Sequence, residues 1–210
     1  SLTGEVGASA SANSHGGVLA SGATVSSTGG GVSLSGTLNN ASISAGTGLT
    51  IGGRVQSSGL TSLNGSATVG NSSGTGLDIQ FGAVISSSAL GVTATGSVSS
   101  STTATNLVAA SISGTISTTS AINVTGAISA PSAVNASGVV ISGGVITGTN
   151  SGNQINITGS GVPAPAPASS RSIYIQGGTV SSTGGQVKLA GDRLEIAGVV
   201  NSSTGRTMIV

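Results

Sequence analysis

The chain has 210 residues, a formal net charge of +1, and only 4% charged and 1% aromatic residues. Five Lys and Arg residues do not form the clustered basic patch that phosphate binding needs, and so few aromatic rings offer no platform for stacked bases, so we expect no nucleic-acid partner. The absence of cysteine excludes disulfide frameworks, thiolate metal sites and cysteine nucleophiles.

The composition nevertheless predicts an ordered fold. Hydrophobic residues make up 36% of the chain, and Val, Ile and Leu recur at regular positions, whereas disordered chains are poor in such residues. Large side chains are too rare to fill a globular core. A narrow parallel β-helix suits this composition, because its small apolar residues stack on equivalent residues of the next coil.

Residues 1–24 are rich in Ala, Ser and Gly and alternate only weakly. We interpret them as an N-terminal arm or a first, irregular coil. No charged and apolar leader opens the sequence, so we expect any signal peptide to have been removed. No run of about 18 apolar residues occurs either, so we expect no membrane-spanning helix.

From residue 25 onward the chain repeats one short phrase: apolar, any, apolar, any, Gly, then one or two residues and another apolar one. Alternation is typical of a strand with one buried face, and we interpret the Gly as a turn. The units recur about every 12 to 21 residues, which indicates a solenoid. Clear copies lie at 32–38, 49–55, 122–128, 139–145, 173–180 and 194–200.

We therefore predict an all-β fold in which residues 25–210 form a single right-handed parallel β-helix (β-solenoid) of about a dozen short coils. At one strand spacing per coil, the rod is expected to be about 55 Å long.

Residues 161–170 interrupt this pattern with Pro163, Pro165 and Pro167, each followed by Ala. Proline cannot donate a hydrogen bond to a β-ladder, so the segment is expected to leave the sheet as a stiff protruding loop. A linker between domains is the alternative. Because the phrase resumes at 173, we favour the loop and treat the three prolines as candidate interaction residues.

The last residues, Thr207, Met208, Ile209 and Val210, are strand-like and largely apolar, with no polar cap behind them. An open solenoid end exposes unpaired backbone groups, as an edge strand does. We predict that this segment is an assembly site. Its expected partner is a second copy of the chain, end to end, or the rest of a longer β-helix.

The sequence offers little for catalysis. Among the four carboxylates, Asp192 and Glu195 form the one pair that is close in sequence, and Lys188 and Arg193 lie near enough to neutralise it. A solvated ion-pair face is the expected role. His15 has no further ligand nearby for a metal, and we expect it in an exposed turn. We predict no enzyme activity, no metal and no cofactor.

The segment 177–192, followed by 194–198, resembles filamentous haemagglutinin-like exoproteins, the β-helical passengers of bacterial two-partner secretion, and 34–43 is similar in style. Known members are large adhesins. The resemblance implies a secreted, cell-surface location and an adhesive or fibre role.

Together these features predict a non-enzymatic, extracellular structural protein that forms or extends a bacterial surface fibre, with an adhesive role toward host or cell-surface glycans. The alternative is a β-solenoid module that binds glycans or ice on a flat face, for which Thr93 and Thr95 offer a local Thr-x-Thr motif.

Overall fold

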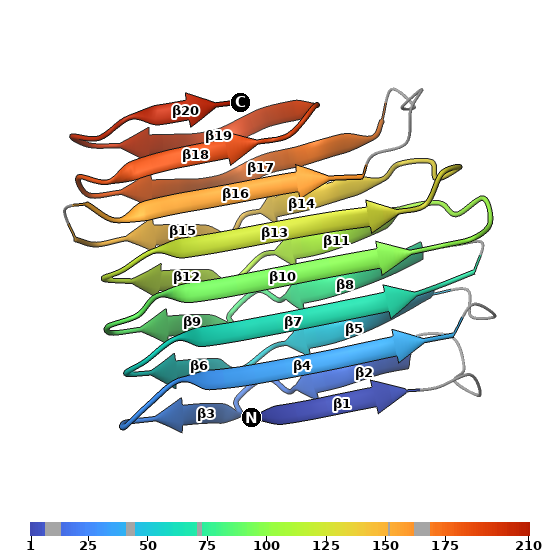
Figure 1. Ribbon diagram of the computed structural model, residues 1–210, viewed down its shortest axis with the longest axis horizontal. Coiled ribbons are helices and arrows are strands. Elements are labelled where there is room, and N and C mark those ends of the chain that lie inside the picture. Colours follow the sequence, from blue (N-terminus) through green and yellow to red (C-terminus); the bar gives the residue numbers. More distant parts are fainter. Residues whose placement is uncertain (7–13, 41–44, 71–72, 151, 162–168) are drawn as a thin grey trace.

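The computed structural model describes residues 1–6, 14–40, 45–70, 73–150, 152–161 and 169–210. Within these ranges the protein is all-β, without helices, and its strands form two parallel sheets that face each other (Figure 1). The chain runs along one sheet, crosses to the other, returns along it and then begins the next coil. The predicted β-solenoid is therefore confirmed. Its right-handed winding stays a prediction.

The first sheet receives one strand from each passage of the chain, and the described residues supply eight. In spatial order, they are β1 (Leu2–Val6), β4 (Val32–Asn39), β7 (Thr61–Thr68), β10 (Val92–Ser99), β13 (Ile122–Ser129), β16 (Gln154–Ser160), β18 (Gln186–Ala190) and β20 (Thr207–Ile209).

The second sheet bends at a corner, so most coils contribute two strands to it. Before the corner lie β2 (Ser14–Leu19), β5 (Ala45–Ile51), β8 (Ser73–Ile79), β11 (Leu107–Ile112) and β14 (Ser137–Ser142). After it lie β3 (Thr24–Ser27), β6 (Arg54–Ser57), β9 (Val84–Ser87), β12 (Thr115–Thr118) and β15 (Val145–Gly148). The longer strands β17 (Arg171–Ser182) and β19 (Leu194–Ser202) pass through the corner.

The register corrects the predicted number of coils. Leu34 pairs with Leu63, and Leu63 pairs with Ala94, so most coils take about 30 residues rather than 12 to 21. The last coil is shorter, about 20 residues from Leu189 to Ile209. The prediction of about a dozen coils was wrong because each coil carries the phrase twice, once in each sheet. Seven spacings separate the eight strands of the first sheet, so the stack is about 34 Å long rather than 55 Å.

The glycine of the phrase has two different roles. In the second sheet it lies at the corner, as expected: Gly143, with φ of 68°, follows β14 in a backbone conformation that other residues rarely adopt. In the first sheet it lies in the middle of a strand, as Gly36 does in β4 and Gly126 does in β13. The interpretation of every phrase glycine as a turn was therefore wrong.

The mid-strand glycines form one column along the rod, in which Gly36, Gly65, Gly96, Gly126 and Gly159 pair in register. A Cβ at Gly96 would overlap the carbonyl oxygen of Ala109 in the second sheet, and the other four glycines face the second sheet in the same way. The two sheets thus touch backbone to backbone, which only glycine permits. This contact divides the interior into two hydrophobic clusters.

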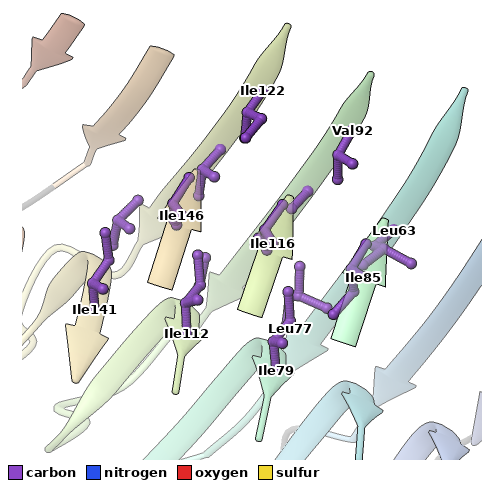
Figure 2. Close-up of a cluster of buried hydrophobic side chains, with 14 of the residues drawn as sticks. Leu63, Leu77, Ile79, Ile85, Val92, Ile112, Ile116, Ile122, Ile141 and Ile146 are labelled. Atoms are coloured by element: carbon purple, nitrogen blue, oxygen red, sulfur yellow. The ribbon is translucent and has the colours of Figure 1, made fainter. Parts of the chain in front are cut away.

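The larger cluster lies on the corner side of the glycine column and consists of stacked aliphatic columns. Figure 2 shows Ile79, Ile112 and Ile141 side by side on successive coils, in the register that the strand pairs give. A second column contains Ile85, Ile116 and Ile146. All six residues are fully buried. Equal side chains stacked at the strand spacing fill a narrow interior without large residues.

The weakly patterned residues 1–24 contain the first two strands and the first residue of β3. β1 pairs with β4, β2 with β5 and β3 with β6, all in parallel. The described parts of this segment therefore have the pairing of a coil. Pro163, Pro165 and Pro167 lie outside the described residues, so the protruding loop stays a prediction.

Candidate functional site

The predicted assembly segment lies at one end of the rod. β20 pairs with β18 through Val187–Thr207 and Leu189–Ile209, and its other edge pairs with no described strand. Ile209 and Val210 are 59% and 58% exposed, and Met208 is 38% exposed. The neighbouring strand β19 pairs with β17 and likewise has a free edge among the described strands.

The opposite end of the rod also has a strand edge that pairs with no described strand, and the sequence did not indicate it. Leu2 in β1, the first member of an inward column, is 59% exposed. Beside it lies an apolar hollow of about 260 Å³, lined in part by Leu2, Leu19, Val25, Leu34 and Leu49. The alternation in 1–24 was too weak to reveal this end, in part because Gly17 occupies the position that Leu49 and Leu77 occupy in the next two coils.

Near the C-terminal end, Arg171 and Glu195 form an ion pair on the surface. The Arg171 guanidinium donates from Nε to the carboxylate of Glu195 and lies 4.7 Å from the centre of the Tyr174 ring. Asp78 lies in the same column as Glu195 but four strand spacings away, about 19 Å. Glycosidase carboxyl groups are about 5 to 9.5 Å apart, so these two do not form such a pair.

His15 lies in strand β2 rather than in the turn that the sequence suggested, and its Nδ1 is 2.8 Å from the hydroxyl of Thr50 in the next coil. Among the residues that the structure describes, no group of three or more His, Asp or Glu side chains lies close enough together to hold a metal ion. Over the same residues, no helix of sufficient length and apolar character to cross the bilayer is found.

A shallow groove of about 660 Å³ runs along the rod beside β3, β6, β9 and β12. Apart from Gln56, every residue that lines it carries a hydroxyl group. Its outward column contains Ser26, Gln56, Ser86 and Ser117, paired in register from coil to coil. The groove lining was not predicted. Its sequence signal is a Ser- or Thr-rich triplet that recurs about every 30 residues, at 26–28, 56–58, 86–88 and 117–119.

Behind this groove, a second column of hydroxyl groups points inward and holds the turns into the first sheet. Ser87 is buried, donates to the carbonyl of Gly59 at 2.6 Å and accepts from the amide of Gly91 at 3.1 Å. Ser182 accepts from the amide of Gly185 at 3.0 Å in the same manner. These inward hydroxyls satisfy backbone groups and so stabilise the turns, whereas the outward ones face solvent.

The threonine pattern on the first sheet is partial. Thr95, Thr125 and Thr158 stack in register on three successive strands. Two residues earlier, however, Thr93 is followed in its column by Asn123 and Asn156, whose amides hydrogen-bond to each other at 2.9 Å. Among the described strands of the first sheet, the Thr-x-Thr motif is thus limited to β10, so this sheet has no regular Thr-x-Thr face.

Comparisons with protein-family models, with curated proteins and with solved structures gave no match to this chain. What is established is the class, a parallel β-solenoid repeat protein. Membership of the filamentous haemagglutinin-like exoproteins stays a prediction from the sequence.

Proposed function

We propose that this chain is a non-enzymatic structural protein that forms or extends an extracellular fibre on a bacterial surface, with an adhesive role along its sides. One observation carries the proposal: the same columns continue in register through every described coil. The column from Leu34 to Leu189, for example, passes without interruption through five further strands.

Such a column suits a mechanical role. Each coil adds a set of backbone hydrogen bonds and a layer of aliphatic side chains, so the stability of the rod is distributed along its length. A force applied along the axis acts on two long parallel sheets together. The surface carries many hydroxyl groups and few charges. It can therefore be hydrated without binding charged molecules strongly.

The extracellular location rests on the sequence resemblance and on the composition. A solenoid that contains no cysteine and few charged residues is compatible with an extracellular location. Labelling producing bacteria with antibodies against the chain tests this directly. We expect immunogold particles along surface fibres, and none on a strain that lacks the gene. Label confined to the cytoplasm would overturn the proposal.

A second candidate function is supported by the hydroxyl-lined groove. Its outward column offers donors and acceptors at the strand spacing, with no formal charge, which suits a neutral glycan lying along the rod. A glycan array with the wild-type chain and with Ser86→Ala/Ser117→Ala tests it. Binding that survives the double substitution would place the glycan elsewhere or show that the groove is inert.

A further inference from the structure

We infer that the corner of the second sheet binds an acidic sugar, that is, a sugar ring that carries a carboxylate. The site is a hollow of about 190 Å³ that Arg54 lines, called here the corner hollow. This inference rests on the second candidate function, glycan binding in the hydroxyl-lined groove, and adds the chemical class of one sugar of that glycan.

The corner hollow exists because successive coils turn the corner with different numbers of residues. Four residues, 20–23, lead from β2 to β3, and four, 80–83, lead from β8 to β9, whereas only two, 52–53, lead from β5 to β6. The strands on both sides of the corner nevertheless stay in register. The two longer turns therefore project beyond the short one and leave a hollow over Gly52 and Gly53.

Polar backbone and side-chain groups converge on this space. The position that a Cβ at Gly52 would take lies 3.1 Å from the amide nitrogen of Ser21 and 3.2 Å from Oε1 of Gln80. The hydroxyl-bearing residues Ser21 and Thr24 line the corner hollow as well. A side chain at Gly52 would fill the space, so its absence leaves room for a small polar ligand.

Arg54 supplies a positive charge that has no partner in the described part of the chain. Its guanidinium forms neither an ion pair nor a hydrogen bond there, since the ion pair joins Arg171 and Glu195. Asp78, the acid nearest to it in sequence, accepts from Nε2 of Gln80 at 3.2 Å. A guanidinium is planar and can donate two parallel hydrogen bonds to a carboxylate. A carboxylate is therefore the ligand group that Arg54 suits best.

An exposed aromatic ring lies at the rim of the corner hollow. Phe81 is 90% exposed and directly precedes Gly82, which lines the hollow and has φ of 84°. The amide of Ala83 donates to the carbonyl of Gln80 at 3.0 Å, so Phe81 and Gly82 are the central residues of a tight turn. A flat exposed ring gives the apolar C–H face of a sugar a surface to pack against, beside the polar groups that bind its substituents.

The corner hollow and the groove lie on the same side of the rod. Arg54 lines the hollow and Gln56 lines the groove, and both residues are on the outward side of β6. Two residues of a strand span about 7 Å, so neighbouring groups of one extended ligand can reach both. The groove continues over three further coils as far as Thr149 without a charged residue. The ligand is therefore a chain of neutral sugars with one acidic sugar near the end beside Arg54.

An NMR titration of the whole chain tests the site with glucuronate and with glucose as its neutral counterpart. We expect glucuronate to shift the amide signals of Gly52, Gly53 and Gly82. Glucose lacks the carboxylate and is expected to bind about tenfold more weakly. Equal affinity for the two sugars, or shifts confined to other residues, would overturn the inference. Tighter binding of an acetylated dipeptide with a free C-terminal carboxylate would overturn it too, because the site would then recognise peptide ends.

Substitutions at exposed positions test the role of each side chain. Arg54→Gln is expected to weaken glucuronate binding about tenfold and to remove its dependence on salt. Arg54→Lys keeps the charge without the paired hydrogen bonds, so its affinity should be intermediate. Phe81→Leu keeps apolar bulk without the flat ring and should weaken both sugars alike.

Arg206→Gln is the matched control. Arg206 is also exposed, and its guanidinium likewise has no partner in the described part of the chain, but it lies near the C-terminal end. This variant is expected to bind glucuronate like wild type, and a thermal melt checks that all variants remain folded. Wild-type affinity in Arg54→Gln, or an equal loss in Arg206→Gln, would contradict the inference.

Failure of the corner site and failure of the groove have different signatures. Neutral glycans that bind as tightly as the same glycans ending in a uronic acid would overturn the corner site and leave the groove in place. Glucuronate binding that needs Arg54 supports the corner site by itself. If longer glycans then bind no more tightly than glucuronate, and Ser86→Ala/Ser117→Ala has no effect, only the groove is overturned.

Discussion

Ile196 pairs directly with Ile175 in the ladder between β19 and β17, yet Ile175 is fully buried and Ile196 is 39% exposed. The two residues have the same place in successive coils. They differ because Ile175 has a coil on each side, whereas Ile196 has a described coil on one side only. In a solenoid, burial depends on the neighbouring coil as much as on the direction of the side chain.

The first prediction concerns the contact between the two sheets. Gly96→Ala would force a methyl group into the carbonyl oxygen of Ala109 and push the sheets apart. We expect a loss of about 1 to 3 kcal/mol in the free energy of unfolding, measured by denaturant titration. Gly29→Ala is the control, because a Cβ there meets no atom within 4 Å. Equal stability of the two variants would contradict the close approach.

The second prediction concerns the aliphatic columns. Ile116→Ala removes a fully buried side chain between Ile85 and Ile146 and leaves a cavity that stacked neighbours fill poorly. The expected cost is about 2 to 5 kcal/mol in the free energy of unfolding. Ser117→Ala, on the outward side of the same strand, should change it by less than about 0.5 kcal/mol. A small effect of Ile116→Ala would mean that the column repacks freely.

The third prediction concerns the inward hydroxyls that hold the turns into the first sheet. Ser87→Ala leaves the buried amide of Gly91 without its acceptor and removes the donor to Gly59. We expect a loss of about 1 to 3 kcal/mol in stability, with faster amide exchange at Gly91. Its neighbour Ser86 points into the groove, so Ser86→Ala should leave both measurements close to wild type. Unchanged exchange at Gly91 in Ser87→Ala would disprove the role assigned to this hydroxyl.

The fourth prediction concerns the surface ion pair. Glu195→Gln removes the negative charge that pairs with Arg171. The side chains of Arg171 and Glu195 are 26% and 46% exposed. Exposed pairs contribute little, so the loss of stability should be about 0.2 to 1 kcal/mol in dilute buffer and smaller in concentrated salt. A melt at both salt concentrations checks this. A loss that is large and independent of salt would show that the pair has a different role.

The sequence predicted the local structure where alternation was strong. The residues 32–38 and 122–128 lie in β4 and β13, and their alternate apolar residues are buried. The sequence also indicated that residues 207–210 are exposed, although it did not indicate the exposure of Leu2 at the other end. That end is hard to recognise because its first coil is rich in glycine and alanine.

The number of coils could not be predicted because the same phrase occurs in two settings. Around Gly36 it spans a straight strand that touches the other sheet, and around Gly143 it spans the corner. Both settings require a residue without a side chain, one for space and the other for its backbone conformation. Because the glycine-containing motif occurs once in each sheet, counting its copies gives two for every coil.

The sequence by itself determined that the chain is a β-solenoid with small aliphatic interior residues, because period-two alternation follows from the geometry of a single strand. The tertiary structure decided the length of each coil, the division of the core by the glycine column and the hydroxyl-lined groove. These features depend on which residues about 30 positions apart become neighbours. That register is set by the packing of whole coils against each other. It cannot be derived from the sequence of a single motif.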